Sequence, residues 1–185
     1  NTYYNNFEAI NPIEHIKHRL KSPESIAGKL KKKDLPVTAD AADEHLSDIA
    51  GIRIICSYAK NIYEIVEIIK SQEAFTVVSE KDYLRNVKKT GYRSYHMIVE
   101  VNLGHLFSEQ TCRVEIQLRT SAMDFWATLE HKVRYKYDGQ IPEQLSGELQ
   151  NCAEQIHALD ERMYLIHKVL DMINQSEVDI EQIGY

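Results

Sequence analysis

Two acidic residues beside apolar runs are the first candidates for chemistry in this sequence. Asp48 lies at the start of the apolar stretch in the segment SDIAGIR, and Glu115 lies in EIQLRT, where apolar and polar residues alternate. A Mg²⁺ ion on a nucleotide usually takes one or two carboxylates together with phosphate oxygens. Both residues could therefore hold a metal–nucleotide complex. Ordinary ion pairing at the end of a strand is the alternative, and the pattern alone leaves both interpretations open.

Basic residues form two patches in a chain that is acidic on average. The 185 residues include 22 Lys or Arg and 28 Asp or Glu, for a formal net charge of −6. Seven basic residues nevertheless fall in 12–33 against two Glu, and five fall in 81–96 against one Asp. This distribution favours a small polyanion such as nucleotide phosphates over a nucleic-acid backbone, although basic helix faces are often merely solvated. Cations that could meet the charge developing in phosphoryl transfer are Arg19, Lys21, Lys29 and Lys32.

The segment GYRSYH adds an aromatic side chain to these charges. It is typical of a turn that opens a strand, with Tyr92 exposed beside Gly91 and able to stack on a base. A turn without a function is the alternative. The sequence contains neither of the phosphate-loop motifs GxxxxGK and GxGxxG, nor HExxH, nor GxSxG. Any phosphate chemistry must therefore use side-chain cations and a metal held by carboxylates.

Hydrophobic periodicity predicts the elements that would position these residues. Strict alternation over Arg113–Arg119 predicts a strand with one buried and one charged face. A stripe of Ile13, Ile16, Leu20, Ile26 and Leu30 predicts a helix over 13–33, followed by a connection through Leu35-Pro36 to Ala42. The remaining predicted elements are strands over Ile49–Tyr58, Phe75–Val78 and Tyr95–Val101, and helices over Ile62–Lys70 and from Thr120 or Ser121 to Tyr135. The fold class is α+β (mixed α/β), with helices flanking a sheet of four or five strands.

A heptad repeat marks the last part of the chain. Its apolar positions, here named the heptad seam, are Leu145, Leu149, Cys152, Ile156, Leu159, Met163, Ile166, Leu170 and Ile173. Their alternating spacing of four and three predicts a long C-terminal amphipathic helix that packs on another helix. The seam does not reveal whether that partner belongs to the same chain or to another copy.

Cysteine usage and hydropathy predict the compartment. Cys56, Cys112 and Cys152 are far apart, lack a CxxC pair and lie among apolar neighbours, which is typical of reduced core residues. No apolar run approaches the roughly 18 residues of a membrane span, and the first residues lack a signal-peptide core. We therefore expect a soluble, cytoplasmic domain.

Four segments, in this order, resemble the synthetase domain of the RelA/SpoT family: DIAGIR, GYRSYH, EIQLRT and DFWATLEHKVRYKYDG. The chain as a whole resembles the single-domain small alarmone synthetases, from about Pro12 to Asp160. The resemblance implies a nucleotidyltransferase-like mixed sheet. It also implies transfer of the β,γ-pyrophosphate of ATP to the 3′-hydroxyl of GTP or GDP, which yields AMP and the stringent-response alarmones pppGpp or ppGpp. Residues 1–140 would form the catalytic domain, and residues 141–185 a helical extension for packing or oligomerisation.

The resemblance also implies roles for individual residues. Asp48 and Glu115 would bind Mg²⁺, and Glu115 would help to deprotonate the 3′-hydroxyl. The residues implied at ATP are Arg19, Lys21, Lys29 and Lys32 on the phosphates, and Arg53 and Lys81 on the adenine. Those implied at the acceptor are Tyr92 stacked on guanine, Lys88 and His96 on its phosphates, and Gln117 near its base.

Departures from the family pattern bear on adenine binding and on regulation. Lys81 stands where the family often has Arg, and an ammonium stacks on adenine less well than a guanidinium. Relatives activated by their own product have Phe, Thr and Asn where this chain has His15, Lys17 and Asp124, so we expect that activation site to be absent. The resemblance also implies no hydrolase activity, because the metal-dependent hydrolase domain of the long family members is missing here, consistent with the absence of a His-Asp pair.

Two alternatives to guanine pyrophosphorylation stay open. The same fold could use adenine nucleotides or tRNA as acceptor, because Tyr92 by itself selects only a purine. The chain could instead be a non-catalytic module that binds single-stranded RNA, although the presence of both Asp48 and Glu115 argues against a dead enzyme. For the long helix, the resemblance implies a homotetramer.

Overall fold

The computed structural model describes residues 11–104, 111–137 and 141–183. Its elements are β1 (Ile13–Leu20), α1 (Pro23–Lys32), α2 (Ala39–His45), β2 (Ala50–Cys56), α3 (Ala59–Lys70), β3 (Phe75–Asp82), β4 (Tyr95–Asn102), β5 (Thr111–Thr120), α4 (Ser121–Lys136) and α5 (Glu143–Ile183). They form two compact units. One comprises the described residues up to 88 together with the described residues of 92–121, and the other comprises 89–91 together with the described residues from 122 onward. The domain boundary expected after residue 140 borders a stretch that lies outside the described residues.

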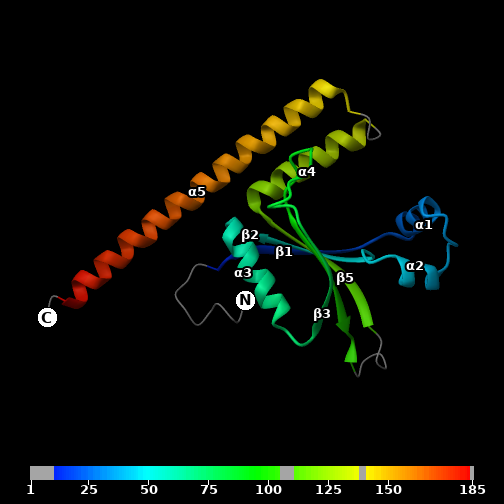
Figure 1. Cartoon of the computed structure of the whole chain (residues 1–185), viewed down its shortest axis with the longest axis horizontal. Coiled ribbons are helices and arrows are strands. Elements are labelled where there is room, and N and C mark those ends of the chain that lie inside the picture. The colour runs from blue at the N-terminus through cyan, green and yellow to red at the C-terminus, as the bar shows by residue number, and fades with distance from the viewer. Residues whose placement is uncertain (1–10, 105–110, 138–140, 184–185) are drawn as a thin grey trace. The chain divides into compact units, whose positions relative to one another are not determined.

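The first unit is built on a five-stranded mixed sheet in the order β1-β2-β5-β4-β3 (Figure 1). The central pair β2–β5 is parallel, and the other neighbouring strands pair antiparallel. Apolar side chains of β4 and β5, among them Met97, Val99, Ile116 and Leu118, are buried on one face. The helix α3 packs on the sheet through a buried stripe of Ile62, Ile65, Val66 and Ile69. This arrangement confirms the expected mixed sheet flanked by helices, with five strands.

The helix expected over residues 13–33 is wrong in its first half, because residues 13–20 form the edge strand β1. Only β2 pairs with this strand, antiparallel, so most of its side chains are exposed and need no apolar alternation. The spacing of Ile13, Ile16 and Leu20 matched the period of an amphipathic helix by coincidence. The helix α1 begins only at Pro23, whose ring suits a first helical turn, and Ser22 caps it by accepting from the Ser25 amide at 3.3 Å.

A small apolar cluster holds α1 against α2. Leu30 is completely buried, and Ala41, Ala42 and Leu46 complete the cluster. The connection expected up to Ala42 is therefore partly helical: α2 begins at Ala39, after Thr38 accepts from the Ala41 amide at 3.2 Å. This packing sets the position of the basic residues on α1.

The second unit consists mainly of α4 and α5. The Trp126 indole on α4 donates to the Leu149 carbonyl on α5 at 2.9 Å. Gly91 approaches α5 so closely that a Cβ there would lie 2.5 Å from the Ala153 Cβ, and its φ of +86° also favours glycine. Any larger residue at position 91 would separate these segments. The expected start of α4 at Thr120 or Ser121, with Asp124 in its first turn, is confirmed.

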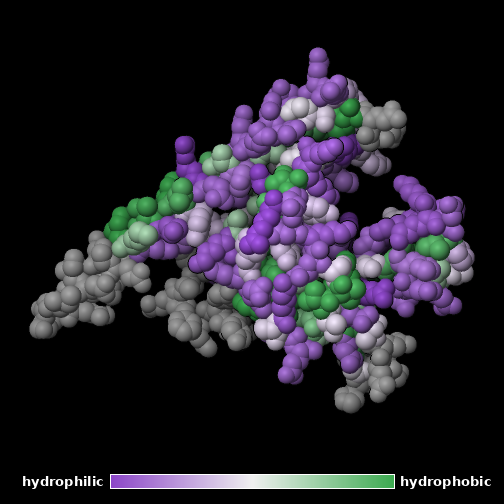
Figure 2. Space-filling view, viewed as in Figure 1, coloured by the Kyte–Doolittle hydropathy of each residue, from purple (hydrophilic) through white to green (hydrophobic). Residues whose placement is uncertain are grey.

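Much of the heptad seam is exposed on the single chain. Ala153 and Asp160, one position beyond the seam residues Cys152 and Leu159, are the buried side chains of α5 among the described residues. Seam residues exposed by roughly half are Leu159, Met163, Ile166, Leu170 and Ile173. Figure 2 shows this apolar surface in green along the later part of α5.

The cysteines do not all lie in the core. Cys56 is buried, but Cys112 is half-buried and Cys152 is exposed, so the expectation of three core residues is wrong for Cys152. An apolar neighbour in the sequence need not be a neighbour in space on a two-faced helix. Within the described part of the chain, none of the helices combines the length and hydropathy needed to span a membrane.

Candidate nucleotide site

The charged face of the sheet collects most of the candidate residues through strand register. Lys17 is opposite Arg53, Arg53 is opposite Gln117, Gln117 is opposite His96, and His96 is opposite Lys81, so one row crosses all five strands. Directly opposite residues point to the same face of a sheet. The adjacent row contains Arg19, Gly51 and Glu115. Residues from distant parts of the sequence thus share one surface.

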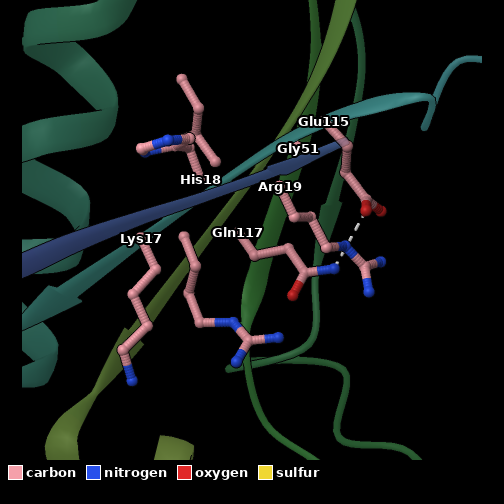
Figure 3. A pocket seen from close by; sticks show the side chains of 8 residues that line it. Lys17, His18, Arg19, Gly51, Glu115 and Gln117 are labelled. Carbon is pink, nitrogen blue, oxygen red and sulfur yellow. Dashed lines mark hydrogen bonds between the residues drawn. The ribbon is translucent and has the colours of Figure 1, made fainter. Parts of the chain in front are cut away.

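A pocket of about 320 Å³ opens on this face (Figure 3). Its lining consists of Lys17, His18, Arg19, Gly51, Ile52, Arg53, Glu115 and Gln117. In Figure 3, Lys17, Arg19, Glu115 and Gln117 extend to one side of the strands, whereas the His18 ring lies on the other side. Three cationic side chains and one carboxylate therefore converge where the sequence predicted the ATP-binding residues Arg19 and Arg53.

Asp48 lies just before β2 and is held by two lysines. Its Oδ2 accepts hydrogen bonds from Lys21 and from Lys29, the latter at 2.7 Å. Burial opposes ionisation of Asp48, but the two lysine hydrogen bonds and their charges outweigh it and lower the pKa of the carboxyl group. Asp48 therefore remains a carboxylate. Its Oδ1 is buried and has no hydrogen-bond partner within the described residues.

Glu115 is held on the other side of the site by neutral and aromatic partners. Gln117 Nε2 donates to its Oε2 at 3.0 Å, and His96 Nδ1 lies 3.5 Å from its Oε1. The His96 interaction lowers the pKa of Glu115 most, with Gln117 contributing, against burial and the nearby charge of Asp48. Strand register places Glu115 opposite Gly51, three residues after Asp48, so both carboxylates lie at the same end of β2. Both candidate metal ligands are thus ionised and neighbouring.

Tyr92 is half-buried rather than exposed, which corrects the sequence expectation. Its hydroxyl lies 2.8 Å from His96 Nε2, and the ring contacts those of Tyr83 and His96 edge-on. Lys88 Nζ lies 4.6 Å from the centroid of the Tyr92 ring and 4.4 Å from that of Tyr83. The predicted acceptor residues Tyr92, Lys88, His96 and Gln117 therefore form one connected group.

Several predicted ATP residues do not line the pocket. Lys21 and Lys29 contact Asp48 instead, next to the predicted metal position. Lys32 on α1 and Lys81 on β3 are exposed and lie outside the pocket lining. The pocket therefore brings together only the two arginines among the residues predicted at ATP.

Sequence reasoning gave no catalytic role to two other residues that the site contains. Lys17 lines the pocket, and Arg119 is buried beside Tyr92. The alternation over Arg113–Arg119 did place Arg119 on the charged face, which was the available signal. The helix wrongly predicted over residues 13–33 gave no reason to place Lys17 at the site.

The arrangement suits the binding of two polyphosphates beside a pair of carboxylates. Arg19, Arg53 and Lys17 can oppose phosphate charge in the pocket, while Lys88 and His96 supply a second polar region next to an aromatic ring. Glu115 lies between the two regions and carries a negative charge that can accept a proton. Such a site positions two nucleotides for direct transfer without needing a covalent intermediate.

Comparison with known proteins identifies close relatives. A model of a region found in RelA/SpoT proteins matches residues 18–140. GTP pyrophosphokinase YwaC of Bacillus subtilis (strain 168) is 46% identical over 168 residues, which are 91% of this chain and 80% of the relative. The crystal structure of small alarmone synthetase 1 from Bacillus subtilis bound to its product pppGpp matches with a TM-score of 0.81 and 40% identity, covering 90% of this chain and 84% of that one.

A second similar structure is that of small alarmone synthetase 1 from Bacillus subtilis bound to AMPCPP, with a TM-score of 0.74 and 36% identity. The match covers 92% of this chain and 86% of that one. The family model spans well over half of the present chain, and the similar proteins are matched over most of their length. Three of the segments that resembled the family in the sequence contribute to this site: DIAGIR and EIQLRT provide Arg53, Glu115 and Gln117 to the pocket, and GYRSYH provides Tyr92 and His96 to the neighbouring aromatic group. This chain belongs to the RelA/SpoT family.

Proposed function

We propose that this protein is a GTP pyrophosphokinase, which transfers the β,γ-pyrophosphate of ATP to the 3′-hydroxyl of GTP or GDP and releases AMP. The observation that carries this proposal is the convergence of Arg19, Arg53 and Glu115 in one pocket, next to the group around Tyr92. Relatives that match most of the chain are named as GTP pyrophosphokinases, and one related structure holds pppGpp. The products would be pppGpp from GTP and ppGpp from GDP.

Each residue group has a physical task in this reaction. Arg19, Lys21, Lys29 and Lys32 bind the ATP phosphates, and Arg53 and Lys81 hold the adenine. Tyr92 stacks on guanine with Gln117 near the base, while Lys88 and His96 bind the acceptor phosphates. Glu115 accepts the proton of the 3′-hydroxyl as the oxygen attacks the β-phosphorus. In-line attack of this kind depends on positioning and on neutralised charge more than on covalent chemistry.

Asp48 and Glu115 fit the needs of a Mg²⁺ site. Among the described residues, no group of three or more His, Cys, Asp or Glu could hold a metal, so these two carboxylates would act together with phosphate oxygens. The buried Asp48 Oδ1 has no hydrogen-bond partner in the described part of the chain, as expected for an oxygen reserved for a cation. When bound, Mg²⁺ would neutralise charge on the transferred phosphates. Lys21 and Lys29 would keep Asp48 ionised for it.

The exposed heptad seam supports a proposal about assembly. A single chain leaves Leu159, Met163, Ile166 and Leu170 half-exposed on one side of α5, and heptad positions of this type pack against a second helix. We propose that residues 1–140 carry catalysis and that residues 141–185 join copies of the chain into a homotetramer. Since ATP and GTP are cytoplasmic metabolites, we propose that the enzyme acts in the cytoplasm.

The test of the reaction is an incubation with Mg²⁺, labelled ATP and either GDP or GTP, followed by separation of the products. The expected result is AMP together with a guanosine tetraphosphate or pentaphosphate. Formation of neither product would contradict the proposal. The same assay with adenine nucleotides and then with tRNA as acceptor would identify a relative with changed specificity.

A further inference from the structure

Arg119 is a buried cation to which no role in the reaction has been given above. Its side chain is only 5% exposed although it lies on the charged face of the sheet. A buried guanidinium is costly unless its donors are satisfied. Arg119 Nη2 donates to the Tyr92 hydroxyl oxygen at 2.6 Å and to Gln117 Oε1 at 3.1 Å. Its Nε lies 3.4 Å from Oγ of Ser94, which is itself buried and donates to the Leu118 carbonyl.

A guanidinium can only donate hydrogen bonds, so the groups that face Arg119 must accept from it. Since Gln117 Oε1 accepts from Arg119, the amide nitrogen of Gln117 must point the other way, toward Glu115 Oε2 at 3.0 Å. A flipped amide would place two oxygens against each other. Arg119 therefore makes Gln117 a donor to the catalytic carboxylate.

The same argument applies to the aromatic side of the site. Because the Tyr92 oxygen accepts from Arg119, its own proton is available to His96 Nε2, 2.8 Å away. A neutral imidazole that accepts at Nε2 carries its proton on Nδ1. That nitrogen lies 3.5 Å from Glu115 Oε1. In this arrangement Gln117 Nε2 donates to Glu115 Oε2, and His96 Nδ1 faces Glu115 Oε1.

The five residues Arg119, Tyr92, His96, Glu115 and Gln117 form a closed polar ring, built by β4, β5 and the turn before β4. The Arg119 guanidinium also lies 5.1 Å from the centroid of the Tyr92 ring, so it steadies the ring as well as its hydroxyl. Resting on the proposed function, we propose that Arg119 is a positioning residue that orients Tyr92 for the acceptor base and points two donors at Glu115.

Steady-state kinetics of Arg119→Met test the proposal. We expect kcat/KM for the guanine acceptor to fall ~10- to 100-fold, as for other residues that orient a catalytic group. The KM for ATP should change by no more than about twofold, because Arg119 does not line the pocket. The matched control is Arg113→Met on the same strand, whose guanidinium pairs with Glu100 at 3.6 Å and should leave the kinetics unchanged. An equal rise in the KM for ATP and in the KM for the acceptor would overturn the proposal.

Coupling to Tyr92 distinguishes positioning from a general structural role. Tyr92→Phe removes the hydroxyl between Arg119 and His96 and keeps the ring. If Arg119 acts through that hydroxyl, the double variant should lose less acceptor kcat/KM than the product of the two single losses. Independent, multiplicative losses would contradict the proposal.

A measurement without substrate covers the case in which Arg119→Met does not fold. Imidazole ¹⁵N NMR of the wild-type protein should show the neutral His96 ring protonated on Nδ1, with Nε2 accepting the hydrogen bond of the Tyr92 hydroxyl. A wild-type His96 protonated on Nε2 would overturn the proposal. Failure of the proposed function is a separate result, since the wild-type protein would then form no product while its His96 tautomer could still be observed.

Discussion

Lys29 donates a hydrogen bond to Asp48 Oδ2 at 2.7 Å, joining α1 to the residue that lies just before β2. Lys21, which follows β1, donates to the same oxygen. Two lysines assigned to ATP phosphates therefore also neutralise the carboxylate assigned to the metal. A nucleotide that brings both phosphates and Mg²⁺ would exchange these ion pairs for new ones, so nucleotide and metal binding should be energetically linked.

Lys29→Met should raise the KM for ATP by about tenfold, the effect expected from losing one charge-assisted hydrogen bond. The KM for the guanine acceptor should change much less, because Lys29 lies on the Asp48 side of the site. The matched control is Lys31→Met, which removes an exposed charge from the same helix. Initial-rate measurements with each substrate varied in turn would check this. A similar rise for both variants would show that only the general charge of α1 matters.

Glu115→Gln should abolish synthesis while leaving the fold intact. Loss of a group that accepts a proton in the transition state typically lowers kcat ~100-fold or more. The isosteric amide has nearly the same shape and volume, so circular dichroism and the melting temperature should stay near wild-type values. Glu100→Gln is the control, since Glu100 pairs with Arg113 on the neighbouring strand away from the pocket. Appreciable turnover by the Glu115→Gln variant would remove Glu115 from catalysis.

Tyr92→Ala should weaken the guanine acceptor more than ATP. Stacking of a base on an aromatic ring is worth roughly 1–3 kcal/mol, so the KM for GDP or GTP should rise about tenfold or more. The control is Tyr135→Ala, which truncates a tyrosine that is 82% exposed on α4. If both substrates lost affinity equally, Tyr92 would not belong to the guanine site.

Cys56 should be unreactive in the folded protein even at alkaline pH. Burial, with a contribution from the Glu14 carboxylate, raises the pKa of its thiol to about 12, whereas a thiol in an unfolded chain has a pKa of ~8.5. The stability that folding gains by keeping this thiol neutral is thus fully present below pH ~8.5. It is lost as the pH rises toward the pKa of the thiol in the folded protein.

The measurement uses a variant with Cys112→Ser and Cys152→Ser, so that Cys56 is the single remaining thiol. At pH ~9, a thiol reagent should label it in denaturant and not under native conditions. Rapid native labelling would show that the β2–α3 core opens readily.

Ile166→Glu should break the proposed assembly. This seam residue is about half-exposed on the single chain, so the substitution removes an apolar contact between copies without disturbing a buried core. Light scattering should show a tetramer for the wild-type protein and smaller species for the variant. Glu161→Lys changes a charge on the same helix outside the heptad seam and should leave the mass unchanged. A wild-type monomer at working concentration would contradict the proposal.

Local pattern was sufficient for much of the sheet. The alternation over Arg113–Arg119 correctly predicted β5 with Ile116 and Leu118 buried and Glu115 and Gln117 on the charged face, because a period of two depends only on backbone geometry. The strand β1 was missed because an edge strand with two exposed sides carries no such period. Its exposure depends on where it pairs, which is a property of the whole sheet.

The sequence by itself determined the family, the faces of the central strands and the long final helix, since each rests on motifs or on short-range periodicity. The tertiary structure decided which side chains contact one another. Lys21 and Asp48 are 27 residues apart, as are Tyr92 and Arg119, and only strand register and the packing of α1 bring them together. Side-chain pairs at that separation have no local signal, because their distance depends on the folding of all the residues between them. For this reason Arg119 was visible as one charge on a strand, while its place in the ring around Glu115 required the fold.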